Sequence, residues 1–589
     1  MNRDKWDVLI VGTGILECIV AAGLSCRGFS VLHIDPASSY GTYWNTIKLD
    51  NLNKWLTSNR DLDDHMFDTS PFSNKFGWVN SSHSNSNDLL NKFCIDLLPK
   101  MIFSRSPLVD ILLSCKITHY LEFQGVNYLS FYNIDDDFKD MFTTKKLSRD
   151  EVSEEGSLHT KYISPIPNKF INIPFSKKTI FASTDLTLYE KRSLMKLFKG
   201  MSHLLDSSAG KQKKDLDIRN DPFRSPAVLA NSIENINELD LDLVVNSWPL
   251  FQKKWKLTNK TLDMVRFCIA LNFDTETNIN WQMDVVNPIG KLIRSLNQHG
   301  CSGTPFLFPC YGVCDIPQAF SRFAAVNGAV YRLHTHIENI KKYNDGWEVD
   351  IRNYEMEEAI TIKSKLLIGS PRLLSQIYDG PKQENIRRIF RMFVITCKPL
   401  IIQEETFQED ILFASIKINQ TKNPTDNHVE VVNIMQCGSS SGCCPKGSYI
   451  INICKIMSKT ESAEEVTMQF ERLLRYFFNN SNKVQDNYID CIIYKGGYIY
   501  NREFQDPIFT SDGIIYTADP FIDLSSFFIL DGDIQNAMTI LQHALNYLQL
   551  DNKEILTPIT FKKEELIETL SIKEQCNDMI FQKFREVFE

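Results

Sequence analysis

Hydrophobic residues near the start of the chain form two strand-like runs separated by one helix-like run. Residues 6–11 are a short β-type run, residues 15–26 have helical character, and residues 30–34 return to a strand pattern. A strand, a helix and a strand in this order predict a βαβ unit. The chain therefore opens as an α/β protein does.

Apolar residues repeat at helical spacing further along the chain. Residues 93–123 show this spacing with interruptions at proline, and residues 186–205 show it on one face, with Asp185 available as N-cap. More helix is expected through 239–271. From 305 onward β-type runs return, so we predict a large α/β domain into which a smaller helical domain is inserted.

These patterns divide the chain into four parts. Residues 1–92 are the first part of the large domain, with a loop insertion rich in Ser, Asn and Asp near 59–87. Residues 93–275 are expected to form a mainly helical domain with connecting strands, and residues 276–560 the remainder of the large domain. Residues 561–589 are expected to form a C-terminal amphipathic helix. Because its charges are mixed rather than basic, we expect it to dock on its own protein rather than on a membrane.

Composition narrows the class of protein. A length of 589 residues exceeds what one hydrophobic core usually supports, so at least two domains are expected. The net charge of -9 argues against a general nucleic-acid binder, because neutralising phosphates requires a basic surface. We expect the 15 cysteines to be reduced, since the first apolar run resembles neither a secretory signal nor a membrane span. They lack partners at zinc-ligand spacing, so no metal site is expected.

The turn after the first strand carries the candidate chemistry. Gly12, Gly14 and Glu17 occupy the fingerprint positions of a dinucleotide-binding loop, and Asp35 ends the next strand. The third fingerprint position normally holds a small residue, whereas Glu17 adds bulk and negative charge where a diphosphate would bind the helix N-terminus. The residues alone leave two interpretations open: an FAD-dependent oxidoreductase with a defective loop, and a dinucleotide-binding fold kept for another purpose.

Three separated blocks carry a family resemblance. They are 7–19 with Tyr40-Gly41, 95–123, and the block Tyr311-Gly312-Val313-Cys314-Asp315-Ile316-Pro317-Gln318-Ala319-Phe320-Ser321-Arg322. Together they resemble the Rab GDP-dissociation inhibitor and Rab escort protein superfamily, which carries Glu at the place of Glu17. The resemblance implies a large domain of the FAD/NAD(P)-binding-like (Rossmann) type with a helical domain inserted. It also implies a protein without cofactor that catalyses no reaction itself.

Finer features resemble the escort branch. They include Trp44 after Tyr40-Gly41, the segment 304–309 and the greater length of the chain. Two departures from the family pattern concern the hallmark turn, where Asp315 replaces the usual Glu and Cys314 the usual Gly. Both the side-chain reach and the loop flexibility at this turn therefore differ from the family pattern.

The resemblance implies a Rab-binding platform with Tyr40, Asp315 and Arg322 at matching positions. A tyrosine offers a rigid anchor and an arginine a planar fork of five donors, and both are favoured in interface hot spots. The alternative is an internal pair between Asp315 and Arg322, or solvated loop charges.

The resemblance also implies that a prenyltransferase docks on the helical domain, where a Phe enters a pocket of the enzyme's α subunit. Phe181 is the best match and Leu194 a weaker candidate; alternatively, Phe181 is a hydrophobic staple on its own helix. The apolar helices could part to hold a geranylgeranyl chain.

The expected function is therefore that of an escort protein. It binds GDP-bound Rab GTPases, presents them to the α/β heterodimer of Rab geranylgeranyltransferase, and shields the geranylgeranyl lipid during delivery to membranes. Cytoplasmic localisation with transient membrane association follows from this function. A Rab GDP-dissociation inhibitor is the closest alternative, and an FAD-dependent oxidoreductase is a more distant one.

Overall fold

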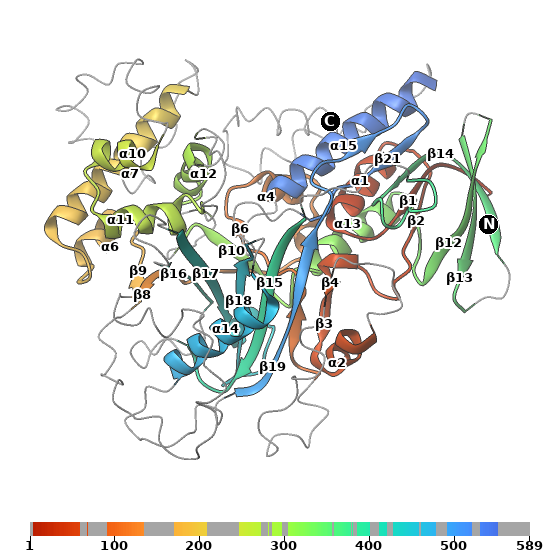
Figure 1. Cartoon of the computed structure of the whole chain (residues 1–589). Helices are drawn as coiled ribbons and strands as arrows, with labels where there is room; N and C mark the ends of the chain where they lie inside the picture. Colours follow the sequence, from red (N-terminus) through yellow and green to blue (C-terminus); the bar gives the residue numbers. More distant parts are fainter. Residues whose placement is uncertain are drawn as a thin grey trace, which may run out of the picture.

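The computed structural model consists of two large sheets, covering helices and a cluster of helices at one end (Figure 1). It describes residues 4–58, 67–68, 91–134, 170–208, 247–272, 281, 285–296, 298, 304–344, 346–355, 359–378, 380, 386–400, 411–420, 428–458, 461–478, 492–520 and 531–551. The expected C-terminal helix at 561–589 and nearly all of the expected insertion at 59–87 lie outside these residues. Among the described helices, none has both the length and the apolar character needed to cross a membrane.

The first strand lies in the middle of an eight-stranded sheet because apolar residues bury both of its faces. The sheet has the order β11-β2-β1-β14-β13-β12, and β21 continues it beside the end of β14. In chain order its strands are β1 (Lys5–Val11), β2 (Val31–Ile34), β11 (Val330–Arg332), β12 (Thr335–Tyr343), β13 (Gly346–Asn353), β14 (Ile360–Gly369), β20 (Ile508–Phe509) and β21 (Ile514–Tyr516). Helix α1 (Ile15–Ser25) joins the parallel strands β1 and β2, which confirms the predicted βαβ opening.

Helices α1, α13 (Asp315–Val326) and α15 (Asp531–Asp551) pack together against this sheet. Gly23 permits the close crossing of α1 and α15, since a Cβ there would lie 2.5 Å from Leu541. Strands β1, β2, β14 and β21 are parallel, so the segments that follow them meet at one edge of the sheet. This is the edge at which α/β folds bind ligands.

The second sheet has the order β4-β19-β15-β18-β17-β16-β8-β9. Its strands are β4 (Phe67–Asp68), β8 (Tyr128–Ile134), β9 (Ile171–Asn172), β15 (Arg387–Thr396), β16 (Leu412–Gln420), β17 (His428–Cys437), β18 (Tyr449–Ile456) and β19 (Ile492–Arg502). Helix α14 (Ala463–Phe478) packs Phe470 against Phe390 on one face of this sheet.

Short elements connect the two sheets and support the candidate site. Strand β10 (Phe306–Pro309) pairs with β6 (Ile102–Phe103) and β7 (Phe123–Gly125), and ends directly before the hallmark block. The remaining connecting elements are η1 (Thr42–Trp44), β3 (Thr46–Lys48), α2 (Leu49–Ser58), β5 (Cys94–Asp96), α4 (Pro107–Ser114), η4 (Ile117–Tyr120) and η10 (Ser439–Ser441).

A group of helices forms the left end of the molecule in Figure 1. These helices are α6 (Lys177–Ala182), α7 (Leu188–Ser208), α10 (Trp248–Trp255), α11 (Asn259–Met264), the π-helix η8 (Val265–Ile269) and α12 (Asn287–Arg294). These helices span residues 177–294. Residues 93–134, which also belong to the predicted helical domain, contribute several strands instead. The division at 92 and 275 stays a prediction.

The start of α7 differs from the expectation. Its cap is Thr187 rather than Asp185, because the Thr187 hydroxyl accepts a hydrogen bond from the Glu190 backbone N–H (3.3 Å). The Glu190 carboxylate in return accepts one from the Thr187 backbone N–H (2.9 Å). This reciprocal pair is a capping box, and it fixes where the helix begins.

Candidate functional site

The turn after β1 has the backbone shape of a dinucleotide-binding loop. Gly12 has φ +98°, a conformation that side chains other than glycine rarely adopt, and a Cβ there would approach Leu373 to 3.0 Å. Gly14 is the N-cap of α1 and provides no side-chain cap. The sequence therefore predicted the path of the backbone correctly, and the surrounding side chains decide what it can bind.

Asp35 is engaged by groups of its own chain. Its Oδ2 accepts hydrogen bonds from the Thr13 backbone N–H (2.7 Å), the Thr13 hydroxyl (2.6 Å) and the Thr42 hydroxyl (2.8 Å). Its Oδ1 accepts one from the Ala37 backbone N–H (2.7 Å). In dinucleotide enzymes the acidic residue at this strand end binds a ribose hydroxyl. In this chain, donors from the protein itself bind the Asp35 carboxylate in place of a ribose hydroxyl.

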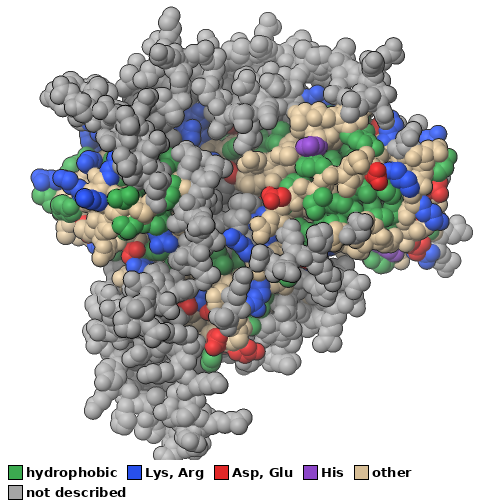
Figure 2. Space-filling model, turned by 45° about the horizontal axis from the view of Figure 1, so that its top comes forward, with side chains coloured by type: hydrophobic (Ala, Val, Ile, Leu, Met, Phe, Trp, Pro, Cys, Tyr) green, Lys and Arg blue, Asp and Glu red, His purple; other side chains and the backbone are tan. Residues whose placement is uncertain are grey.

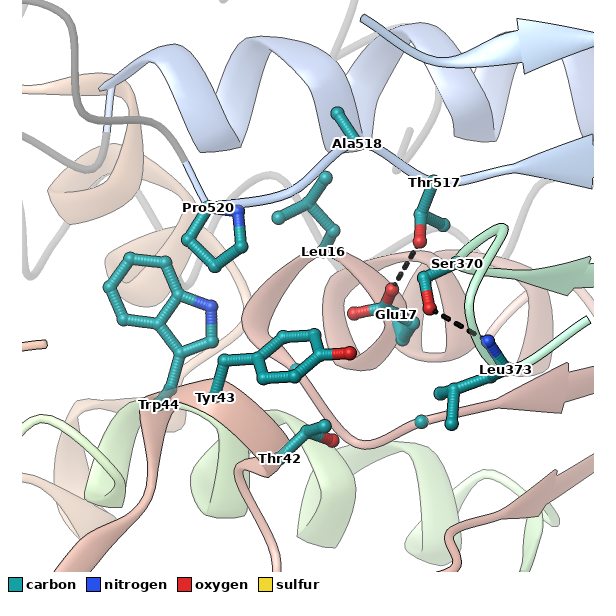
Figure 3. A pocket seen from close by; sticks show the side chains of 12 residues that line it. Leu16, Glu17, Thr42, Tyr43, Trp44, Ser370, Leu373, Thr517, Ala518 and Pro520 are labelled. Carbon is teal, nitrogen blue, oxygen red and sulfur yellow. Dashed lines mark hydrogen bonds between the residues drawn. The ribbon is translucent and has the colours of Figure 1, made fainter. Parts of the chain in front are cut away.

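Glu17 lies over Gly14, where a diphosphate would meet the helix N-terminus. A Cβ on Gly14 would be 2.5 Å from Glu17 Oε2. Glu17 Oε1 accepts a hydrogen bond from the hydroxyl of Thr517, at 2.6 Å (Figure 3). Burial raises the pKa of the Glu17 carboxyl to about 7, although the hydrogen bond from Thr517 opposes the rise.

The remaining space at this edge of the sheet is small. Tyr43, Trp44, Leu16 and Pro520 surround it (Figure 3), and about 300 Å³ is empty, part of it open to solvent. Pockets for drug-sized ligands range over roughly 300–1,000 Å³, and FAD is a large ligand on that scale. With Asp35 engaged and Glu17 over the turn, the residues present do not fit a flavin dinucleotide.

The hallmark block forms a tight loop between β10 and α13. Gly312 has φ +126°, and a Cβ on it would collide with Thr46 and lie 2.7 Å from Asp96 Oδ1. Asp96 Oδ1 accepts hydrogen bonds from the Val313 backbone N–H (2.9 Å) and the Thr46 hydroxyl (2.5 Å). Burial raises the pKa of the Asp96 carboxyl to about 6. The pair of the half-buried Thr46 and the buried Asp96 thus fixes the shape of the loop.

The structure brings Tyr40 and the hallmark loop together. The Cys314 thiol donates a hydrogen bond to the Tyr40 carbonyl at 3.2 Å, and Gln318 Nε2 donates to the sulfur. Cys314, which departs from the family pattern, therefore adds a contact between the two segments. Burial raises the pKa of this thiol to about 11, so it stays protonated at neutral pH. The Tyr40 ring packs beside Tyr331, with ring centres 5.9 Å apart.

Asp315 and Arg322 do not pair with each other. Arg322 is exposed, and its guanidinium carbon lies 4.1 Å from the centre of the Tyr120 ring. Asp315 is half-buried, and burial raises the pKa of its carboxyl. Among the described residues neither side chain takes part in an ion pair. Both side chains belong to α13, and both are therefore available to a binding partner.

Two exposed tyrosines flank this helix, and the sequence did not single them out. Tyr311 is 52% exposed and Tyr120 44% exposed. The Tyr311 backbone has φ +65°, and its ring covers Gly442, where a Cβ would lie 2.7 Å from the ring. Both residues lie within the blocks that carry the family resemblance. This position is the signal by which the sequence could have identified them.

The two residues predicted for transferase docking have different environments. Phe181 is 57% exposed on α6, whereas Leu194 is 1% exposed in the core. Leu194 is therefore a packing residue of α7, and its assignment to a partner contact is wrong. The sequence could not separate these roles, because a core residue and an exposed anchor share the same helical spacing.

The alternative for Phe181 was a hydrophobic staple, but other residues take that position. Ser176 caps α6 in a capping box with Thr179. The residue before this cap, Phe175, and the fourth helical residue, Ile180, are both buried, as a staple requires. Phe181 is thus left on the surface of a capped helix.

Within the described residues, no set of three His, Cys, Asp or Glu side chains is placed to hold a metal ion. The cysteines of the same residues are free, and most of them are buried.

Comparisons with known proteins agree with the resemblance seen in the sequence. The sequence profile of the family described as GDP dissociation inhibitor matches residues 1–225 and 230–493. A Candida albicans protein named Rab proteins geranylgeranyltransferase component A is 26% identical over 76% of this chain and 58% of its own length. A Schizosaccharomyces pombe protein named probable secretory pathway GDP dissociation inhibitor 1 is 22% identical over 82% of this chain and 88% of its own length.

The fold is also found in a solved structure. The crystal structure of a Rab GDI from Plasmodium falciparum has a TM-score of 0.59 at 20% identity, covering 94% of this chain and 100% of that one. The predicted fold class is confirmed. The match spans little more than half of the Candida albicans protein, and the relatives carry names of both the escort and the inhibitor kind.

Proposed function

We propose that this chain, which belongs to the GDP dissociation inhibitor family, works as a Rab escort protein. In this role it binds GDP-bound Rab GTPases and presents them to the α/β heterodimer of Rab geranylgeranyltransferase. It then shields the attached geranylgeranyl group until the Rab reaches a membrane. Three features of the site support the proposal.

The first feature is the exposed side of α13 with the loop before it. Asp315 and Arg322 have no ion pair among the described residues, and Tyr40 and Tyr311 stand beside them. The contacts of Asp96 with the loop hold this surface in one conformation. A preformed surface with an arginine and tyrosines matches the composition of protein interface hot spots, and so suits a GTPase partner.

The second feature favours the escort role over the inhibitor role, and it is the observation that carries the proposal. Phe181 exposes 57% of its surface on a capped helix, and Leu188 and Tyr189 are exposed at the start of the next helix. Lys and Arg side chains gather with hydrophobic ones at this end of the molecule (Figure 2). An exposed aromatic side chain on a capped helix, with the Lys191 ammonium bonded to the Phe181 backbone carbonyl, suits a pocket with an acidic rim, which we assign to the transferase.

The third feature is the altered cofactor loop. Glu17 lies over the turn and Asp35 is engaged, so we propose that the chain binds no flavin and carries out no bond chemistry of its own. The fold then serves as a rigid support for the two binding surfaces.

A reconstituted prenylation assay tests the proposal. Purified chain is added to an unprenylated Rab, the transferase heterodimer and labelled geranylgeranyl diphosphate. We expect labelled Rab only when the chain is present. If the chain instead extracts prenylated Rab from vesicles and does not support labelling, it is a Rab GDP-dissociation inhibitor. If it binds no Rab in either state, the proposal is wrong.

A further inference from the structure

The ring of Tyr120 lies against Arg322, the residue to which we assign a Rab contact. The guanidinium carbon is 4.1 Å from the ring centre, and Tyr120 remains 44% exposed. The face of an aromatic ring attracts a cation, and the N–H groups at the edge of the guanidinium stay free to donate hydrogen bonds. Tyr120 can therefore orient Arg322 without using up its donors.

The chain holds Tyr120 in this place through contacts on both sides. Tyr120 ends η4, which packs on α13, and Ile117 of the same turn is fully buried. Two residues later, the Glu122 carbonyl accepts a hydrogen bond from the Cys310 backbone N–H (2.9 Å), where β7 begins to pair with β10. The ring and the guanidinium thus belong to two elements that are tied together.

The charges nearby leave Arg322 available. The acidic side chain closest in sequence to Tyr120 is Glu122, and its charge raises the pKa of the Tyr311 hydroxyl, so it faces Tyr311. Among the described residues, the Arg322 guanidinium contacts the Tyr120 ring and takes part in no ion pair. An arginine held by a ring alone is ready for an acceptor on a partner.

We propose that Tyr120 is a positioning residue of the Rab-binding platform. Its ring keeps the guanidinium of Arg322 directed toward the GTPase, where a carboxylate or a backbone carbonyl accepts its hydrogen bonds. A long side chain loses rotamer freedom when it is ordered in an interface, and an arginine already ordered by a ring loses less. The inference rests on the proposed function, because it assumes that Arg322 contacts a Rab.

The test compares variants of the full chain in binding kinetics with a GDP-bound, unprenylated Rab. Tyr120→Leu removes the ring and is expected to raise the dissociation rate about fivefold, the effect of an exposed cation–π contact. Tyr120→Phe keeps the ring and is expected to stay within about twofold of wild type. Tyr120→Trp offers a better face and is expected to dissociate no faster than wild type.

A double-mutant cycle separates positioning from direct contact. In the Arg322→Ala background, Tyr120→Leu is expected to have no further effect, because the ring then has nothing to orient. Tyr343→Leu is the matched control. Tyr343 is 43% exposed and holds Lys363 over its ring at 3.9 Å, on the sheet edge away from α13. This variant is expected to bind as wild type does.

The outcomes distinguish the inference from the proposed function. If wild type binds Rab and Tyr120→Leu dissociates at the wild-type rate, the inference is overturned and the function stands. The same holds if Tyr120→Leu acts equally with and without Arg322, since Tyr120 then contacts Rab itself. If wild type binds no Rab, the proposed function fails first. Thermal melting of each variant shows whether a binding change comes from lost stability.

Discussion

The hydroxyl of Thr517 donates a hydrogen bond to the carboxylate of Glu17 across 500 positions of the sequence, at 2.6 Å. The bond joins the first helix to the residue that directly follows β21, the last strand of the first sheet. It keeps an acidic side chain over the turn that would otherwise receive a diphosphate. Glu17 is thus built into the fold, and its ionisation is linked to stability.

Replacing Glu17 with a neutral isostere should change how stability depends on pH. The pKa of Glu17 is about 7 in the folded chain and 4.5 ordinarily, so the folded state holds a proton that the unfolded state has released. The contribution of this group to folding stability is fully present below pH 4.5 and is lost as the pH rises through about 7. Glu17→Gln avoids this loss. Between pH 5 and pH 8 its free energy of unfolding should gain on the order of 3 kcal/mol relative to wild type.

Urea unfolding of both proteins at pH 5 and pH 8 measures this difference. The Gln amide oxygen can still accept from Thr517, so the comparison isolates the charge. A stability difference that stays constant over this pH range means that Glu17 is already ionised in the folded chain at pH 5.

The purified protein should be colourless. Asp35 and Glu17 are engaged with other groups of the chain, so flavin added during refolding should not be retained. An absorbance spectrum after gel filtration checks this. Flavin bands near stoichiometric occupancy contradict the assignment of the loop as altered.

Phe181→Ala should weaken transferase binding and leave Rab binding and stability near wild type. Loss of an exposed hot-spot anchor typically costs ~2 kcal/mol or more of binding free energy. Leu194→Ala is the control, because this buried side chain should cost about 2–5 kcal/mol of folding stability. Titration calorimetry and thermal melting measure the two effects. A large drop in the melting temperature of Phe181→Ala would show that Phe181 is a packing residue and not an anchor for the transferase.

Arg322→Ala should raise the dissociation rate of the Rab complex at least about tenfold, which corresponds to roughly 1.4 kcal/mol. Because the guanidinium rests on Tyr120 and not on Asp315, the melting temperature should change little. Surface-binding kinetics beside calorimetric melting check both. Unchanged kinetics remove Arg322 from the platform.

Gly312→Ala should disturb the hallmark loop. Its positive φ and the collision with Thr46 and Asp96 add strain, so both stability and Rab affinity should fall. Gly328→Ala is the matched control, since Gly328 also has positive φ, +97°, but a Cβ there meets nothing within 4 Å. It should lower stability by about 1 kcal/mol and leave Rab binding intact. Equal effects of the two variants on Rab affinity would exclude a special role for the loop.

Local patterns in the sequence predicted the opening of the fold and placed Glu17 beside its glycine turn. The strand, the glycine turn, the helix and Asp35 lie close together in the sequence, where spacing and hydrophobic period are informative. The capping box of α7 was also readable, because Thr187 and Glu190 have the spacing that defines it. Asp185 has Leu188 at the corresponding position, so it lacks the second half of this signal.

The environment of the site could not be predicted in the same way. Thr517 bonds to Glu17, Asp96 bonds to Val313, and Tyr120 lies against Arg322, each across a long stretch of chain. No local period encodes such contacts, because they depend on how the sheets pack. The family resemblance implies that Tyr40, Asp315 and Arg322 lie on one surface, but only the folded structure shows that the charges of Asp315 and Arg322 do not pair.

The bond between Glu17 and Thr517 also bears on how the protein is made. A ribosome adds roughly 5–20 residues per second, so Thr517 emerges on the order of a minute after Glu17. Strand β14, which pairs with β1, is made partway through that interval, whereas β21, which pairs with β14, is made only at its end. Completion of this sheet must therefore wait until β21 has been made. A chain cut short before β21 leaves the end of β14 with an open edge, which is the kind of surface that chaperones retain and aggregates recruit.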